Sequence, residues 1–248
     1  MKIIISPAKK MIIDTDTFET SSPKFLEQTK IIKQKLQNLS DEQLQKIWKC
    51  SDSIAKTNIQ RLQTMNFDTA TTPAILAYEG LQYKHMGASV FSTDEFAYLD
   101  RHLRILSGFY GILKPLDGVV PYRLELQAKL EVGGSKDLYA FWGDKIANEL
   151  LSQSDTIINL ASKEYSKAIT PYLNQNTKFI TCTFAELKNE KLIEKGTMCK
   201  MARGEMVRFM AQNNVESLDG VKAFDVMGYK FSESYSNENN LVFIKGDK

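Results

Sequence analysis

A hydroxyl group and two ammonium groups follow directly on the first apolar run of this 248-residue chain. Ser6, Lys9 and Lys10 come after residues 2–5, a run that predicts a short buried strand. Pro7 cannot continue a strand ladder, so we expect the strand to end at Ser6. In α/β proteins ligands bind beyond the carboxyl ends of strands, which makes this segment a candidate anion site. A plain strand followed by solvated lysines is the simpler alternative.

A second group of polar side chains leaves an expected strand at residues 156–160. Asn159, Ser162, Glu164 and Tyr165 supply an amide, a hydroxyl, a carboxylate and a phenol within seven residues. A helix that begins after Ser162 would direct its free N–H groups at an anion. Simple capping of that helix explains the same residues.

A third group lies on a helix predicted near the C-terminus. Lys200, Arg203 and Arg208 fall on one face of this helix at 100° per residue. The opposite face is apolar and carries Ala202, Met206, Phe209 and Met210. Gly204 falls within the basic face, where the missing side chain would let a ligand or another backbone come close. An amphipathic surface helix is the alternative.

Aromatic and charged residues alternate in three segments in the middle of the chain. The segments are 104–111, 121–125 and 136–143, and their candidate site residues are Arg104, Tyr110, Tyr122, Arg123, Glu125 and Lys136. This composition suits base stacking beside phosphate-binding arginines. It equally suits packing of a glycine-rich loop against the core, and packing is the safer interpretation for Phe141 and Trp142.

The elements that must position these residues alternate between strands and helices along the chain. Strands are predicted at residues 2–5, 74–78, 156–160, 179–184, 223–226 and 241–244. Helices are predicted from residue 26 to 39, from Ser40 through Trp48, around 54–62, from Ser92 to about Gly108 and at 137–151. Ser40 with Gln43 and Ser92 with Glu95 fit capping boxes. We therefore expect an α/β fold, mixed α+β in detail, with one large mixed sheet flanked by helices.

Composition limits the classes of function. The 32 basic and 30 acidic residues leave a formal net charge of +2, so any site for a polyanion must be a local patch. Three scattered cysteines and two histidines match no disulfide framework or metal signature, so we expect no metal and no cofactor. No signal peptide and no apolar stretch of about 18 residues are found, which indicates a cytoplasmic protein without a membrane partner. The sequence does not set the oligomeric state.

Taken together, the motifs resemble the YaaA family of bacterial proteins, also catalogued as DUF328 and UPF0246. The resemblance rests on seven motifs in order along residues 3 to about 244: Ser6-Pro7-Ala8-Lys9, residues 106–111, residues 121–125, Lys136-Asp137-Leu138-Tyr139, Phe141-Trp142-Gly143-Asp144, Asn159-Leu160-Ala161-Ser162 with Glu164-Tyr165, and Lys200 with Ala202-Arg203-Gly204. It implies one YaaA-like domain over residues 1–248, with a helical region at about 24–68.

The resemblance also implies a function. Such a protein responds to peroxide stress in the cytoplasm and limits unincorporated iron and oxidative DNA damage. It is expected to bind double-stranded DNA without sequence specificity, through a positively charged cleft and a helix-hairpin-helix-like element. That element would map onto residues 40–65, a helical hairpin excursion in the N-terminal third, although the glycine-bearing turn is absent between Trp48 and Ile54.

Two hypotheses of different classes follow for the cleft. In the first, cations contact the DNA backbone, and they are Lys9, Arg104, Arg123, Lys200, Arg203 and Arg208. In the second, an enzyme acts on a small anionic metabolite or nucleotide, using donors and acceptors that include Ser6, Tyr110, Tyr122, Glu125, Ser162, Glu164 and Tyr165. Direct binding of iron is the weakest alternative, since neither histidine lies beside a carboxylate pair at the spacing of a di-iron site.

Overall fold

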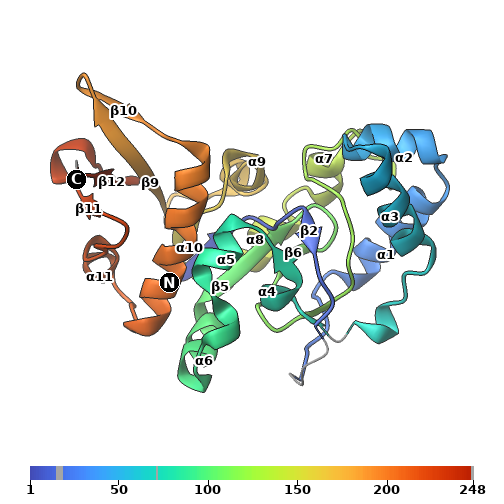
Figure 1. The fold of residues 1–248 in the computed structure, drawn as a ribbon, viewed down its shortest axis with the longest axis horizontal. Coiled ribbons are helices and arrows are strands. Elements are labelled where there is room, and N and C mark those ends of the chain that lie inside the picture. Colours follow the sequence, from blue (N-terminus) through green and yellow to red (C-terminus); the bar gives the residue numbers. More distant parts are fainter. Residues whose placement is uncertain (15–18, 71, 247–248) are drawn as a thin grey trace.

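A large sheet runs through the middle of the molecule (Figure 1). The structure is a computed structural model, and it describes residues 1–14, 19–70 and 72–246. Within these residues the sheet has eight strands, in the order β11 (Tyr229–Phe231), β12 (Asn240–Lys245), β9 (Lys178–Lys188), β8 (Thr156–Leu160), β1 (Lys2–Ile5), β5 (Leu103–Ser107) and β6 (Gly111–Leu113), with β10 (Lys191–Ile193) paired to β9. The expected mixed α/β fold is confirmed.

The centre of the sheet is parallel and its margins are antiparallel. Strands β5, β1, β8, β9 and β12 run parallel to one another, whereas β6, β10 and β11 run antiparallel to the strands they pair with. Ile3 pairs with both Leu103 and Ile158, and all three isoleucines of β1 are fully buried. A strand covered on both faces requires such a continuous apolar run, which is why residues 2–5 predict it.

The chain order of the strands creates a switch point beside β1. From β1 the chain passes to β5 and β6 on one side, and it then returns to β8, β9 and β12 on the other side. The connections that follow β1 and β8 therefore leave the sheet in opposite directions. In open parallel sheets this divergence leaves a crevice at the carboxyl ends of the two strands, where ligands bind.

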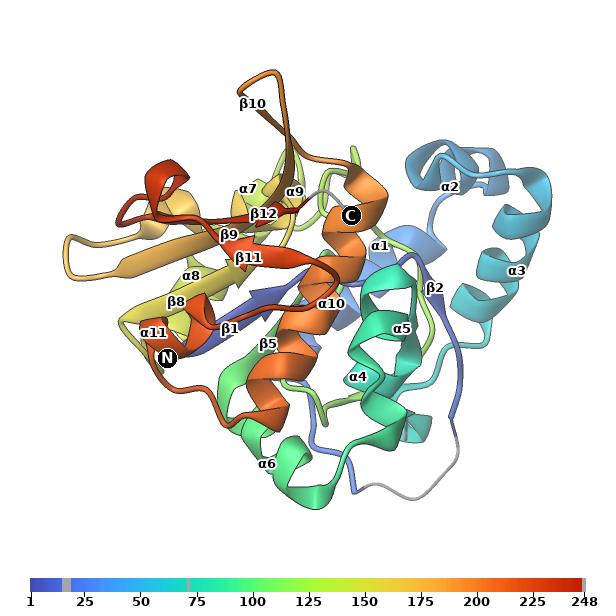
Figure 2. The same cartoon turned by 60° about the vertical axis from the view of Figure 1, so that its left-hand side comes forward.

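Helices cover both faces of the sheet and extend beyond it. Helices α6 (Thr93–His102) and α10 (Gly196–Gln212) lie over one face, with α4 (Ala74–Ala77) and α5 (Leu81–Met86) beside them, while α8 (Lys145–Leu151) lies behind (Figure 2). The shorter helices are α7 (Leu138–Trp142), α9 (Lys163–Ser166) and α11 (Leu218–Lys222). Two-stranded pairings join β2 (Lys10–Met11) to β4 (Tyr78–Glu79) and β3 (Thr72–Pro73) to β7 (Gly118–Val119).

The predicted helical region stands at one side of the molecule as α1 (Leu26–Gln37), α2 (Asp41–Trp48) and α3 (Asp52–Gln63) (Figure 1). Both predicted capping boxes are confirmed, at Ser40 with Gln43 and at Ser92 with Glu95. The turn between α2 and α3 contains Lys49 with φ 45°, the left-handed conformation that glycine usually adopts at the end of a helix. Lys49 thus stands at the turn position where a helix-hairpin-helix element is expected to have a glycine.

Two predictions fail where an apolar run fits either kind of element. Residues 74–78 form the short helix α4 followed by β4, because the Ala74 and Ile75 amides bond to carbonyls of Asp117 and Pro115 rather than to a strand. The helix predicted from Ser92 to Gly108 ends at His102, and residues 103–107 become β5 because they pair with β1. Pairing within the tertiary structure decides such runs.

Two further predictions fail at the boundaries of elements. The helix predicted at 137–151 is two helices, α7 and α8, separated at Gly143 with φ 51°. Residues 223–226 are not a strand; the edge strand is β11, which follows the turn at Gly228 with φ 79°. The strands predicted at 156–160, 179–184 and 241–244 are confirmed as β8, β9 and β12, of which β9 and β12 extend further.

Candidate functional site

A cavity of about 360 Å³ opens at the carboxyl ends of β1 and β8. This is the switch point of the sheet, where the topology predicts a ligand site. Five segments that are far apart in the sequence supply its walls: Ser6–Lys10, Glu79–Tyr83, Tyr122–Glu125, Ser162 with Glu164 and Tyr165, and Lys200 with Arg203. We call this cavity the switch-point pocket.

Hydrogen bonds of Ser6 connect three of the segments that line the pocket. The Ser6 Oγ accepts a hydrogen bond from the Ser162 backbone N–H at 2.9 Å and lies 3.3 Å from the Ser162 hydroxyl. The Tyr83 hydroxyl donates to the Ser6 carbonyl at 2.9 Å. Ser6 therefore joins the exits of both strands to the α5 segment and acts first as a positioning residue.

The segment that carries Arg123 and Glu125 lies against Gly108. A Cβ atom at Gly108 would come within 2.9 Å of the Leu124 carbonyl and the Glu125 backbone, so only glycine fits there. The Tyr122 hydroxyl lies 2.6 Å from the Ser107 Oγ and 2.8 Å from the Tyr78 hydroxyl, inside the core. Contacts with Ser107 and Gly108, at the end of β5, thereby hold residues 122–125 in position.

Helix α10 brings Lys200 and Arg203 to the pocket by packing tightly on α5 (Figure 2). A Cβ atom at Gly204 would lie 2.1 Å from the Gln82 carbonyl oxygen. The sequence predicts that either a ligand or another backbone comes close at Gly204. The structure shows that the backbone of α5 does so. Burial lowers the pKa of the Arg203 guanidinium, and the nearby Cys199 and Glu194 offset only part of this effect.

The charges of the pocket are mixed rather than uniformly positive. The Lys9 Nζ lies 2.8 Å from the Glu125 Oε1, and an Nη of Arg123 lies 3.9 Å from the same oxygen. A second ion pair, between Lys10 and Glu79, spans 2.7 Å. Arg123 also donates to the Trp48 carbonyl at 3.5 Å, which connects the pocket to the end of α2. Four of the six cations expected in the cleft are present, Lys9, Arg123, Lys200 and Arg203, but carboxylates accompany them.

Three buried donors in the walls of the pocket have no hydrogen-bond partner among the described residues. They are the Gln82 Nε2, the Arg123 Nε and the Arg203 Nε. Buried donors are nearly always satisfied in folded proteins, and an unsatisfied one costs about 1–3 kcal/mol. The three nitrogen atoms are themselves inaccessible, but their residues line one cavity, so this wall holds polar groups that the described residues leave unpaired.

The segment after β8 contributes a carboxylate and a phenol. The Glu164 Oε1 accepts a hydrogen bond from the Gln127 backbone N–H at 3.2 Å. Burial raises the pKa of Glu164, and the nearby Glu125 charge raises it further, while Lys9 opposes both effects. Burial also raises the pKa of Tyr165 well above its usual value, so this phenol stays protonated at neutral pH.

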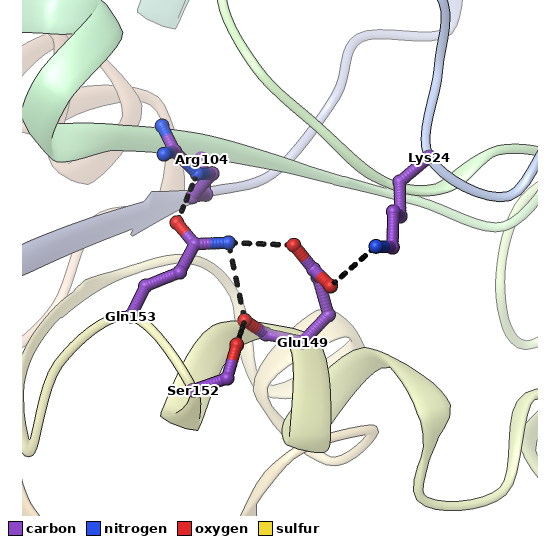
Figure 3. Close-up of polar contacts among 5 residues, drawn as sticks. All are labelled: Lys24, Arg104, Glu149, Ser152 and Gln153. Atoms are coloured by element: carbon purple, nitrogen blue, oxygen red, sulfur yellow. Dashed lines mark hydrogen bonds and ion pairs between the residues drawn. The ribbon is translucent and has the colours of Figure 1, made fainter.

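Arg104 does not reach the switch-point pocket. Its guanidinium donates to the Asp100 and Leu103 carbonyls at 2.8 and 2.6 Å. It also donates to the Gln153 side chain at 2.9 Å (Figure 3). Arg104 therefore covers the carboxyl end of α6, where a cation is favoured by the helix dipole. It lines a separate cavity of about 210 Å³ with Lys24 and Glu149.

Four other candidate residues also lie outside the pocket walls. Tyr110 is fully buried and accepts from the Val120 N–H, and Asn159 is buried in β8 with its amide donating to the Thr181 hydroxyl. Lys136 is exposed on a loop, and the Arg208 guanidinium lies against Gly87 beyond α5. The pocket brings together Ser6, Lys9, Tyr122, Arg123, Glu125, Ser162, Glu164, Tyr165, Lys200 and Arg203.

The sequence reasoning missed the wall supplied by β4 and α5. Glu79, Gln82 and Tyr83 line the pocket, yet their sequence matches no motif for chemistry. The one available signal is Gly80, whose absent side chain leaves room for Ala8, 3.1 Å from where its Cβ would lie.

Thiols and metal ligands do not gather in the described part of the chain. Burial raises the pKa of Cys182 to about 12, and Cys199 donates to the Phe184 carbonyl from a buried position. Residues 1–14, 19–70 and 72–246 hold no group of three or more side chains of the types that bind metals. Nor do they form a helix with the length and apolar character needed to span a bilayer.

Comparison with known proteins shows the family. A family model described as peroxide stress protein YaaA matches residues 1–235. The chain belongs to this family. It is 50% identical over 248 residues to a UPF0246 protein of Lachnoclostridium phytofermentans, covering 100% of this chain and 97% of the relative. A UPF0246 protein of Desulfitobacterium hafniense is 51% identical over 246 residues, covering 99% and 98%.

Membership of the YaaA family confirms the resemblance that the motifs indicate. The matched region contains every residue that lines the switch-point pocket, from Ser6 to Arg203.

Proposed function

We propose that this YaaA-family protein acts in peroxide stress as an enzyme on a small anionic metabolite or nucleotide bound in the switch-point pocket. The observation that carries the proposal is a cavity of about 360 Å³ lined by Lys9, Arg123, Lys200 and Arg203, with unpaired buried donors in its wall. The family resemblance implies less unincorporated iron and less oxidative DNA damage in the cytoplasm. The proposal assigns that outcome to the chemistry of the pocket.

The dimensions of the pocket favour a small ligand over a DNA duplex. A volume of about 360 Å³ lies in the range of small-molecule sites, roughly 300–1,000 Å³. Duplex recognition needs roughly 1,000–2,500 Å² of protein surface and many exposed cations. Of the six cations expected to contact DNA together, Arg104 and Arg208 lie elsewhere, and the Arg203 Nε is buried.

The test measures binding and stability in one variant, Arg203→Met. Methionine keeps the apolar stem and removes a poorly paired buried charge, so unfolding free energy should rise by about 1 kcal/mol or more. Binding of citrate, inorganic phosphate or AMP, followed by calorimetry, should weaken at least 10-fold. Arg101→Ala, at an exposed arginine outside the pocket, is the matched control and should change neither quantity.

Two results would contradict the proposal. One is unchanged binding of these probes by Arg203→Met, which would place the anion site elsewhere. The other is a wild-type protein that binds none of the three probes at millimolar concentration, which would remove the small anion as ligand.

Double-stranded DNA remains a second candidate partner, supported by a different surface. Lys46, Lys49 and Lys56 are exposed on α2, α3 and the turn between them, and they form no ion pair with any described residue. Cations of this kind bind phosphates without reading sequence. DNA affinity that falls steeply with salt and is unchanged in Arg203→Met would support this partner.

A further inference from the structure

Three carboxylates line the switch-point pocket, and they are held in different ways. Glu79 is paired with Lys10 at 2.7 Å. Glu125 contacts two cations, Lys9 at 2.8 Å and Arg123 at 3.9 Å. Glu164 has no ion pair within 4.0 Å in the described ranges of the chain, and its Oε1 accepts one backbone N–H, from Gln127 at 3.2 Å. A pair of carboxylates in unequal surroundings can divide two roles between them.

The position of Glu164 is fixed independently of its carboxylate. Its backbone carbonyl accepts a hydrogen bond from the Tyr139 hydroxyl at 2.9 Å, and the Ser162 N–H two residues earlier is bonded to Ser6. The side chain can therefore gain or lose a charge while the main chain stays in place. Catalytic groups need such support from the residues around them.

The charged and titratable groups that face Glu164 come from four segments. They are Lys9 after β1, Glu125 in the 122–125 wall, Tyr139 in α7 and Tyr165 in α9. Burial and the Glu125 charge raise the pKa of Glu164, whereas Lys9 and the backbone N–H groups of Gln127 and Leu126 lower it. The net direction of the Glu164 pKa is upward, which eases protonation of this carboxylate.

We propose that Glu164 is the catalytic acid–base residue of the pocket and that Glu125 remains a carboxylate that positions Lys9 and Arg123. This assignment rests on the proposed function, because it needs a small anionic substrate in the pocket. As a carboxylate, Glu164 takes a proton from an O–H, N–H or activated C–H group of the substrate. The bonding electron pair stays on the substrate, and Glu164 later returns the proton to it or to the product.

The cations define the class of substrate. Proton removal makes an already anionic substrate more negative, and Arg203, Lys200 and Arg123 line the same cavity to compensate that charge. The substrate class is therefore a small acid, such as a carboxylate or phosphate ester, that carries an exchangeable hydrogen within reach of Glu164.

The other polar groups of the pocket suit this role less well. Tyr165 stays protonated because burial raises its pKa well above the usual value, which prevents it from acting as a base. The Ser6 Oγ already accepts from the Ser162 N–H, and no histidine of the described residues lines the pocket to activate it. Glu79 and Glu125 are held in ion pairs with Lys10 and Lys9, which leaves Glu164 as the pocket carboxylate without an ion pair among the described residues.

The experiment compares Glu164→Gln, Glu125→Gln and an exposed control, Glu131→Gln, in the full-length protein. Each variant is tested for citrate, phosphate and AMP binding and for peroxide survival of a bacterial strain that lacks its own family protein. Glu164→Gln should bind the probes within about threefold of wild type and yet lose protection, since general acid–base groups contribute roughly 10²–10⁴-fold to a rate. Glu131→Gln should match wild type in both assays.

Infrared titration supplies a readout that a structural role would not change. The difference between the wild-type and Glu164→Gln titrations should contain a carboxyl group that titrates above the usual range of glutamate. Asp117, whose pKa burial raises to about 6, is present in both proteins and cancels in this difference. Glu125→Gln should move this titration to lower pH, because it removes a like charge and releases Lys9. Full protection by Glu164→Gln, or the same titration in all variants, overturns the assignment while probe binding still supports the pocket. Absence of probe binding in wild type overturns both proposals.

Discussion

At the scale of single residues, Asp117 shows what burial does to a charge outside the pocket. Its carboxylate accepts the Ser21 hydroxyl at 2.7 Å and the Lys114 N–H at 2.8 Å. Burial nevertheless raises its pKa to about 6, and Lys114 and Arg104 offset only part of this effect. Desolvation thus outweighs two hydrogen bonds and two nearby cations.

The raised pKa of Asp117 predicts a fall in stability with rising pH. An unfolded aspartate loses its proton near pH 4, whereas the folded one keeps it until about pH 6. Between these values the unfolded state is increasingly favoured, by a total of about 3 kcal/mol at two pKa units, and above pH 6 the cost is fully present. Urea unfolding from pH 4.5 to 7.5 should show this slope in wild type but not in Asp117→Asn.

The comparison between the two proteins isolates Asp117 from other carboxyl groups. Glu164 has a raised pKa and Glu95 a lowered one, and both contribute equally in wild type and variant. Stability curves that run parallel across this pH range would show that Asp117 is ionised in the folded protein at the usual pH.

At the scale of elements, the contact between α10 and α5 sets the geometry of the pocket. Gly204 allows the two backbones to touch, and Gln82, Lys200 and Arg203 take their places from that contact. Gly204→Ala should destabilise the protein by about 2 kcal/mol or more, since the new Cβ atom meets a backbone oxygen that cannot rotate away. It should also weaken probe binding.

Gly196→Ala is the control on the same helix. A Cβ atom at Gly196, the first residue of α10, meets no described atom within 4 Å. This change should leave stability within about 0.5 kcal/mol of wild type, and a slight gain is expected from helix propensity. Equal decreases in denaturant midpoint for the two variants would mean that the tight packing at Gly204 is not what matters.

The elements also show how far the sequence predicts this fold. Residues 2–5 and 156–160 predict strands because both faces of a central strand demand apolar side chains. Residues 103–107 do not, because a run that continues a helical stripe becomes a strand only through its pairing with Ile3–Ile5. The difference lies in partners that are distant in the chain, which periodicity does not report.

The sequence also predicts the candidate site only in part. The motifs around Ser6, Ser162 and Arg203 lead to the pocket because each follows a central strand or lies on a long helix. Arg104 belongs to a similar motif, yet its guanidinium bonds to the Asp100 carbonyl of α6 at the other end of β5. The motif does not indicate at which end of the strand the arginine side chain forms its contacts. The pocket wall formed by β4 and α5 contains no motif that predicts it.

At the scale of the whole molecule, charge is divided between two surfaces. A net charge of +2 gives no long-range pull on a polyanion, so any attraction is local. The switch-point pocket mixes cations with Glu79, Glu125 and Glu164, which suits a small ligand. The α2–α3 surface instead presents Lys46, Lys49 and Lys56 to solvent, so the two candidate partners would bind at separable places.

This separation predicts that DNA binding and anion binding respond to different mutations. Charge reversal at all three lysines, Lys46→Glu, Lys49→Glu and Lys56→Glu, should weaken DNA binding in anisotropy titrations at 50 and 200 mM salt. The slope of log K against log salt should become shallower by about 0.9 for each phosphate that the variant no longer neutralises. Citrate and phosphate binding in the pocket should stay within about twofold of wild type.

A control with the same change in net charge distinguishes DNA binding at the α2–α3 surface from an effect of the overall charge of the protein. Lys178, Lys188 and Lys191 are exposed on β9 and β10, on the opposite side of the molecule from α2 and α3 (Figure 1), and their reversal to glutamate alters total charge equally. If the helical surface binds DNA, this control keeps most of the affinity and the salt slope. Equal weakening of DNA binding in both triple variants would mean that binding depends on overall charge alone. Weakening in Arg203→Met alone would mean that DNA binds at the switch-point pocket.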